Sequence, residues 1–280
     1  MIDPFAILVA LAVPIFVVRY FFRKDKPPVP PARVTRTFAL GMTTVVPVFL
    51  VGMPLLLLIL TIPDPVVVGL GMAFLCAAVP EECFKFLVVD KYSFGRRQAS
   101  GATNGLVYGI AASLGFAAVE NVLCAALGGL PFIFMRSLTA IPMHAALGII
   151  MGLQLGRAEM FGADGPTPLW RQARSRAIAW PVILHGLYDA PLMIVMIPIL
   201  RSGGVDGGIP EDKAIEISMM FLLSMLVLGL TLFVAARLNR DARLERQAFR
   251  QLQAEMNARG DDLTEEYYNS YPRPDGQPRL

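Results

Sequence analysis

The sequence predicts an all-α protein, a polytopic membrane helix bundle with about seven transmembrane helices. Of its 280 residues, 55% are hydrophobic and only 17% are charged, a balance that excludes an ordinary soluble domain. A helix that crosses the hydrocarbon core of a bilayer, about 30 Å thick, needs roughly 20 apolar residues. Seven apolar runs meet that requirement, and they lie at residues 4–22, 37–62, 66–90, 103–127, 131–155, 177–200 and 214–236.

The basic residues predict how these spans are oriented. Lys and Arg gather in alternate connections, and the other connections carry only Arg136, Arg201 and Lys213. Because basic connections face the cytoplasm, we expect the N-terminus outside and the C-terminus in the cytoplasm. The basic residues of the first span follow its apolar run, which predicts an uncleaved anchor. The basic connections contain Arg19, Arg23, Lys24, Lys26, Arg33 and Arg36, then Lys91, Arg96 and Arg97, then Arg157, Arg171, Arg174 and Arg176, and finally Arg237, Arg240, Arg243, Arg246 and Arg250.

The chain divides into two parts of different composition. We expect residues 1–237 to form the transmembrane bundle, with the polar motifs inside residues 80–189. Residues 238–280 are expected to form a cytoplasmic charged helix that gives way to a disordered tail beyond Gly260, because the tail lacks a core-forming pattern. Cys76, Cys83 and Cys124 lie inside predicted spans without the spacing of a metal site or a disulfide framework, so we expect no chemistry from them. The alternative for Cys83, which lies beside the two glutamates, is a nucleophile, although nothing local indicates a lowered thiol pKa.

Glycines recur at every fourth position on the fourth and fifth spans. Small residues at this spacing allow two helix backbones to approach closely. Each stripe ends in a polar group, since Asn121 continues the first and His144 continues the second. The stripes predict a close packing of these two spans, either as a seam alone or as a seam that carries polar groups inward. The glycines concerned are Gly101, Gly105 and Gly109 on the fourth span and Gly148, Gly152 and Gly156 on the fifth.

Several ionisable residues lie within the predicted spans, where each costs about 3 kcal/mol even on the most lenient scale. Lys85 follows Glu81 by four residues and Glu82 by three, so it can pair with either carboxylate. Adjacent helix positions diverge by about 100°, so we expect one glutamate to pair with Lys85 and the other to face a cavity. A structural ion pair alone leaves the second glutamate unexplained. Pro80 directly before them is expected to weaken the helix, as is tolerated where backbone lines a cavity.

Both histidines of the chain also lie within spans. His185 and Asp189 have the four-residue spacing of one helix face, so the carboxylate can fix the imidazole tautomer. At about 1.5 Å per residue from the basic ends of the helices, His185 and Glu81 lie roughly 13 Å deep, His144 about 20 Å and Glu120 about 25 Å. Either the fourth span begins later than drawn, or the polar groups line a water-filled cavity without meeting.

Carboxylates, imidazoles and an amide suit hydrolysis by an activated water. A buried glutamate, or a metal held by His and Glu, can deprotonate the water while Asn or His stabilises the oxyanion. Two histidines and a glutamate also form a known ligand set for catalytic zinc, which Glu120, His144 and His185 could supply. The residues alone leave the metal-dependent mechanism, with zinc or another divalent metal, and the metal-free mechanism both open.

Four motifs in order resemble the PrsW family of bacterial intramembrane proteases. They are "PEECFK" from Pro80, "GFAAVEN" from Gly115, "HAALG" from His144 and "HGLYD" from His185, on the third to the sixth spans. The pattern is more distantly similar to the CAAX prenyl protease type, which has a double glutamate, Phe-x-x-x-His and His-x-x-x-Asn/Asp. Glu120 stands where that wider group has histidine.

The resemblance implies an enzyme that hydrolyses a peptide bond of a membrane-anchored, single-span substrate such as an anti-sigma factor. Its partners would be that substrate and the lipid bilayer, with no nucleic acid, and its place a bacterial plasma membrane. Glu81 and Glu82 would activate the water, Lys85 would set their charge, and Asp189 would orient His185. The catalytic set implied in this way is Glu81, Glu82, Lys85, Glu120, Asn121, His144, His185 and Asp189.

The same buried polar residues fit a second class of protein. They could form the path of an ion-coupled or proton-coupled transporter, or sit in a non-enzymatic scaffold that presents a groove to partner helices. A transporter is expected to have two halves with corresponding broken helices, and the sequence has no such internal repeat. A scaffold would keep the glycine seams and tolerate the loss of single glutamates.

Overall fold

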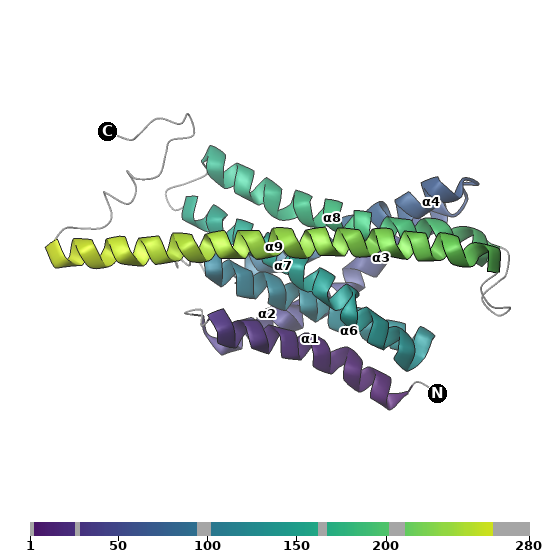
Figure 1. Ribbon diagram of the computed structural model, residues 1–280, viewed down its shortest axis with the longest axis horizontal. Helices are drawn as coiled ribbons and strands as arrows, with labels where there is room; N and C mark the ends of the chain where they lie inside the picture. The colour runs from purple at the N-terminus through teal and green to yellow at the C-terminus, as the bar shows by residue number, and fades with distance from the viewer. Residues whose placement is uncertain (1–2, 26–28, 94–101, 162–166, 202–210, 260–280) are drawn as a thin grey trace.

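The structure is a computed structural model that describes residues 3–25, 29–93, 102–161, 167–201 and 211–259, and in this part helices joined by short connections are the only regular elements, without strands (Figure 1). Two elements are π-helices, and the rest are α-helices. In chain order they are α1 (Pro4–Asp25), α2 (Pro31–Thr43), α3 (Val45–Ile59), α4 (Pro65–Gly71), η1 (Met72–Ala78), α5 (Val79–Leu87), η2 (Val88–Ser93), α6 (Ala102–Leu138), α7 (Ala140–Phe161), α8 (Pro168–Arg201) and α9 (Glu211–Arg259).

Seven stretches of the described residues are long and apolar enough to cross a bilayer, which confirms the predicted fold class. The second comprises α2 and α3, and the third runs from α4 through η2. The start of α1 and the end of α9 lie at opposite ends of the bundle, as an odd number of spans requires (Figure 1). The seven stretches are Pro4–Lys24, Pro31–Ile59, Pro65–Ser93, Asn104–Ala126, Gly128–Met160, Pro168–Ile199 and Lys213–Glu245.

The fifth span departs from the single helix predicted at residues 131–155. The backbone of Gly129 has φ +64°, a conformation that favours glycine, and it kinks α6 before Pro131. A short helical stretch then runs to Leu138, and α7 begins at Ala140 and continues to Phe161. The kink therefore places a short segment between the fourth crossing and α7, and this segment contains Arg136.

The centre of the bundle is the pair α6 and α7. The apolar stretches of their spans are 78% and 89% buried, against 17% in the first and last spans. A Cβ atom on Gly105 would collide with the carbonyl oxygen of Gly152, and one on Gly109 with the carbonyl oxygen of Gly148. The predicted close packing of the two glycine stripes is confirmed, while Gly101 lies outside the described residues.

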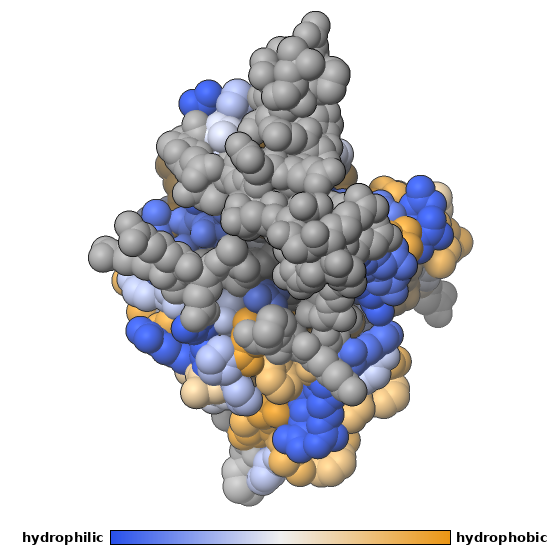
Figure 2. All heavy atoms as spheres, turned by 90° about the vertical axis from the view of Figure 1, so that its left-hand side faces the viewer, coloured by the Kyte–Doolittle hydropathy of each residue, from blue (hydrophilic) through white to orange (hydrophobic). Residues whose placement is uncertain are grey.

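The end of the bundle from which α9 emerges carries hydrophilic groups between hydrophobic ones (Figure 2). An ion pair fastens two elements there, because both carboxylate oxygens of Asp90 in η2 accept from the guanidinium of Arg174 in α8. The guanidinium also lies over the rings of Phe86 and Trp170. This end matches the one that the sequence predicts to face the cytoplasm, and the orientation itself stays a prediction. α9 continues as a helix to Arg259, and the predicted tail beyond Gly260 lies outside the described residues.

Candidate active site

Two π-helical turns frame the segment that carries the double glutamate. Pro80 has no N–H to donate to the carbonyl of Cys76 four residues earlier, and η1 widens the helix at this point. Gly52 of α3 approaches the same carbonyl so closely that a Cβ there would lie 2.8 Å from its oxygen. The helix face of α5 that results buries Glu81, Glu82 and Lys85. A proline and two local widenings thus turn three charged side chains into the bundle.

Lys85 contacts both carboxylates, so the prediction that only one of them pairs with it is wrong. Its Nζ lies 2.9 Å from Glu81 Oε2 and 2.9 Å from Glu82 Oε1, because a long side chain can sit between positions three and four residues back. It also lies 3.3 Å from Nδ1 of His144. An ammonium has three N–H groups and cannot accept, so it donates to all three atoms.

His144 is held from both sides. Its Nδ1 accepts from Lys85, so the ring proton lies on Nε2, which donates to Glu120 Oε2 at 3.0 Å. The ring of Phe116 closes the site beside it, with its centroid 4.2 Å from Lys85 Nζ and 5.9 Å from the centroid of His144. The cation–π contact places the ammonium between the acceptors and an aromatic face.

His185 joins α8 to the double glutamate. Its Nδ1 lies 2.9 Å from Glu82 Oε1, and its Nε2 lies 3.3 Å from Asp189 Oδ2, as the four-residue spacing predicts. Both ring nitrogens therefore face carboxylate oxygens, which only accept, and the arrangement suits a doubly protonated imidazolium. The rings of His144 and His185 meet edge to face with centroids 5.4 Å apart. Imidazoles from two helices thus flank the same pair of carboxylates.

Arg136 belongs to the cluster, although from the sequence it is only a basic residue in a connection. Its Nη2 lies 2.8 Å from Glu120 Oε2, and its Nε donates to Asn121 Oδ1 at 2.8 Å. The kink at Gly129 returns the chain so that residue 136 lies beside residues 120 and 121. A Gly-Gly-x-Pro sequence before an isolated arginine is the signal that could have revealed this return.

All eight residues of the predicted catalytic set come together through these contacts. The predicted disagreement in depth becomes smaller because α7 and α8 extend beyond their predicted ends, to Phe161 and from Pro168, while Glu81 lies only about 18 Å from the end of its span at Ser93. Glu120, His144 and His185 each lie about 25 Å from the basic end at about 1.5 Å per residue. Both sequence-based explanations are therefore wrong, because α6 begins at Ala102, no later than predicted, and the polar groups contact one another directly.

Among the described residues, Arg136 Nη2 lacks a hydrogen bond but lies 2.8 Å from Glu120 Oε2 in an ion pair, and two further buried polar atoms at this site have no partner of either kind. They are Glu82 Oε2, which can only accept as a carboxylate, and Asn121 Nδ2, which can only donate. The amide is oriented because its oxygen accepts from Arg136. Leaving a buried polar atom unpaired costs about 1–3 kcal/mol, so an acceptor and a donor left unpaired in one cluster indicate a place prepared for a further molecule.

The donors fit a divalent metal in type and spacing. Glu81, Glu82 and His144 can each present one ligand atom such that all three lie within 4.8 Å of one another. Carboxylate oxygens and imidazole nitrogens are zinc ligands, and the unpaired oxygen of Glu82 adds an acceptor. The ammonium of Lys85 stands among the same donors. Of the predicted metal set Glu120, His144 and His185, only His144 belongs to this group.

Comparison with known proteins gives the same family on several grounds. The family described as PrsW family intramembrane metalloprotease matches residues 29–227. Protease PrsW of Bacillus subtilis is 33% identical over 190 residues, which cover 66% of this chain and 82% of the relative. Protease PrsW of Geobacillus kaustophilus is 30% identical over 171 residues, covering 61% and 72%. No solved structure matches. The family match and these relatives agree with the motif order and with the clustered carboxylates and histidines. The chain belongs to the PrsW family of intramembrane metalloproteases.

Proposed function

We propose that the protein hydrolyses a peptide bond of a single-span membrane protein, such as an anti-sigma factor, in a bacterial plasma membrane. The observation that carries the proposal is the pair of unpaired atoms, Glu82 Oε2 and Asn121 Nδ2, in one buried cluster of carboxylates and imidazoles. Hydrolysis needs an acceptor for the proton of water and a donor for the oxyanion. The relatives' name as proteases and the membrane spans support the substrate class.

Glu82 is the proposed general base. Its Oε1 is fixed by Lys85 and His185, so Oε2 is held in place without a partner among the described residues, and it can accept a hydrogen bond from a water molecule that enters the site. The water gives a proton to Oε2 while its oxygen attacks the carbonyl carbon of the scissile bond. Lys85 donates to each of the two glutamates, which favours their carboxylate forms. The positive ammonium offsets one of the two carboxylate charges, which keeps the burial of the pair tolerable.

The other residues stabilise the developing negative charge and protonate the leaving group. Asn121 Nδ2 donates to the oxyanion, and Arg136 holds the amide so that this nitrogen stays available. His185, with both nitrogens against carboxylates, protonates the leaving amine, and Asp189 holds the ring in place. A divalent metal held by Glu81, Glu82 and His144 would supply Lewis-acid polarisation of the water or the carbonyl.

The experiment compares the wild type with Glu82→Gln after reconstitution into vesicles with a panel of tagged single-span proteins that includes anti-sigma factors. Glu82→Gln keeps the volume of the side chain and removes the base, so cleavage is expected to fall by about 10³-fold with unchanged membrane insertion. Glu245→Gln is the matched control, because Glu245 is half exposed and pairs with Arg157 outside the cluster. Full cleavage by Glu82→Gln would contradict the assignment of the base.

A transporter or scaffold remains the competing function for the same cluster. Measuring cleavage in the same vesicles with and without a chelator distinguishes metal-dependent from metal-free cleavage. If the wild type cleaves no member of the panel while it conducts protons or ions, the transporter is the better description. Lys85 favours the enzyme over the transporter. Its buried ammonium already donates to three fixed acceptors, so it has no contact left with which to bind a transported ion.

A further inference from the structure

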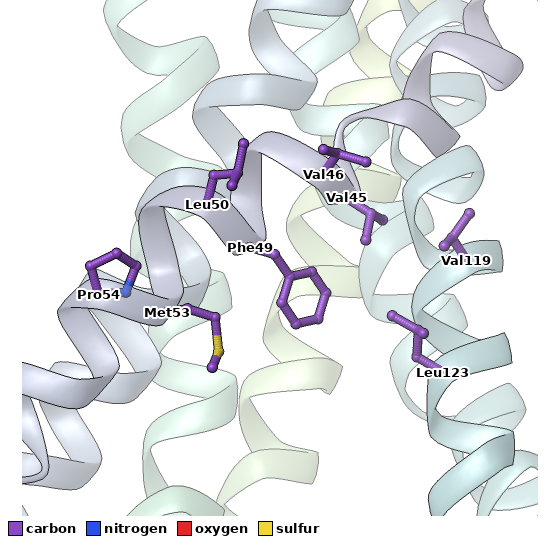
Figure 3. A pocket seen from close by; sticks show the side chains of 8 residues that line it. All are labelled: Val45, Val46, Phe49, Leu50, Met53, Pro54, Val119 and Leu123. Carbon is purple, nitrogen blue, oxygen red and sulfur yellow. The ribbon is translucent and has the colours of Figure 1, made fainter.

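A groove opens on the side of the bundle between α3 and α6 (Figure 3). It encloses about 620 Å³, and its lining side chains are all apolar. Val46, Phe49, Leu50 and Met53 form the wall on α3, and Val119 and Leu123 form the wall on α6. In a bilayer such a face lies against hydrocarbon.

The α6 wall of the groove is continuous with the active site. Phe116, Val119, Glu120 and Leu123 follow the three-residue and four-residue spacing of one helix face. Phe116 packs with Val45 and Val48 of α3 on one side, and its ring contacts Lys85 on the other. The aromatic ring therefore separates the bottom of the groove from the ammonium that holds the double glutamate.

Exposure indicates from which side a substrate can reach these groups. The side chains of Glu82 and Lys85 are 0% exposed, whereas that of Glu120 is 29% exposed. Glu120 shares its helix face with the wall of the groove, so the most accessible carboxylate of the cluster borders the apolar surface. Glu120 directly follows the groove residue Val119 and pairs with Arg136, so a peptide that continues from the groove along this face of α6 reaches a charged pair suited to its backbone N–H and C=O groups.

We propose that this groove docks the transmembrane helix of the protein substrate, which enters sideways from the bilayer. The proposal rests on the proposed function, since it names the route by which the scissile segment reaches Glu82. Apolar side chains of the substrate pack against Val46, Phe49 and Leu123, and a locally unwound stretch passes Phe116 beside Glu120. A lipid chain would fill the apolar groove equally, but its hydrocarbon has no polar groups to meet Glu120, which follows Val119 of the α6 wall, or Arg136, which pairs with Glu120.

The test places a photo-crosslinking benzoylphenylalanine at Val46, in full-length Glu82→Gln protein reconstituted with the tagged single-span panel. Val51 is the matched control, because it is an exposed valine on the same helix that does not line the groove. The expected result is a crosslink to at least one panel protein from position 46 and none from position 51. Crosslinks to lipid alone, or equal crosslinks from both positions, overturn the proposal.

A second measurement uses cleavage in an otherwise wild-type chain. Val46→Trp and Leu123→Trp fill the groove and are expected to lower cleavage at least tenfold, mainly by raising KM, while Val51→Trp stays within twofold of the wild type. If both groove variants cleave as fast as the wild type, the docking proposal is overturned, while the proposed protease function still stands. If the wild type cleaves nothing, the proposed function fails, and the crosslink from position 46 alone decides whether a helix docks there.

Discussion

Lys85 Nζ lies 2.9 Å from Glu82 Oε1, and neither side chain is exposed to solvent. The same ammonium donates to Glu81 and His144, so one residue joins both glutamates of α5 to the imidazole of α7. The cluster is therefore a single unit in which a cation compensates for two adjacent carboxylates. Removal of the Lys85 ammonium is therefore expected to affect folding as well as catalysis.

Replacing Lys85 by Met keeps much of the side-chain length and removes the charge. Breaking a buried ion pair from one side costs about 3–5 kcal/mol, because an uncompensated carboxylate is left behind. Lys85→Met is expected to be less stable by about that amount in detergent unfolding experiments. Lys85→Met combined with Glu81→Gln should recover part of the loss, and equal stability of all three proteins would contradict the pairing.

Added Zn²⁺ is expected to restore part of the stability that Lys85→Met loses. The donors that Lys85 occupies are the ones that fit a divalent metal, so the variant should bind Zn²⁺ more tightly than the wild type. The measurement is the shift of the unfolding midpoint with added Zn²⁺, which reports binding to the folded state without any assay of cleavage. A larger shift for the wild type than for the variant would show that the ammonium and the metal do not share these donors.

Arg136→Ala tests a residue that the predicted catalytic set does not include. Without the guanidinium, Asn121 loses the contact that orients its amide, and Glu120 loses its cation. Loss of one oxyanion donor costs about 10²–10³ in rate, so kcat/KM is expected to fall at least 100-fold. Arg157→Ala is the control, since Arg157 pairs with Glu245 away from the cluster. Similar activity of both variants would remove Arg136 from the site.

Gly152→Ala tests the packing of α6 against α7. The added Cβ would collide with the carbonyl oxygen of Gly105, so the helices must separate, at a cost of about 3 kcal/mol. Gly229→Ala in α9 makes the same change where nothing lies within 4 Å, and it is expected to be neutral. The check is the unfolding midpoint of both variants in one detergent. Equal midpoints would mean that the seam tolerates wider spacing.

The sequence predicted the parts of the site that depend on helical periodicity. The spacings of Glu81 with Lys85, of His185 with Asp189 and of the glycines on α6 and α7 hold in the structure, because a continuous helix fixes which side chains share a face. The seven spans follow from hydropathy for a similar reason, since a bilayer requires long apolar helices.

The sequence could not predict the parts that depend on local departures from a regular helix. The π-helices on either side of α5 and the positive φ of Gly129 are tertiary outcomes, and they decide where Lys85 and Arg136 lie. Predicting one partner for Lys85 rested on a regular helix with fixed side-chain directions. A flexible lysine instead reaches both carboxylates.

The most direct test of the central claim is a double-mutant cycle of cleavage with Glu82→Gln, His185→Gln and the combined variant. Because Glu82 Oε1 and His185 Nδ1 lie 2.9 Å apart, base and acid act as one unit, and each single variant should lose nearly as much kcat/KM as the double variant. The account predicts this strong non-additivity with normal membrane insertion. Losses that simply multiply, or a single variant that keeps full activity, would contradict it.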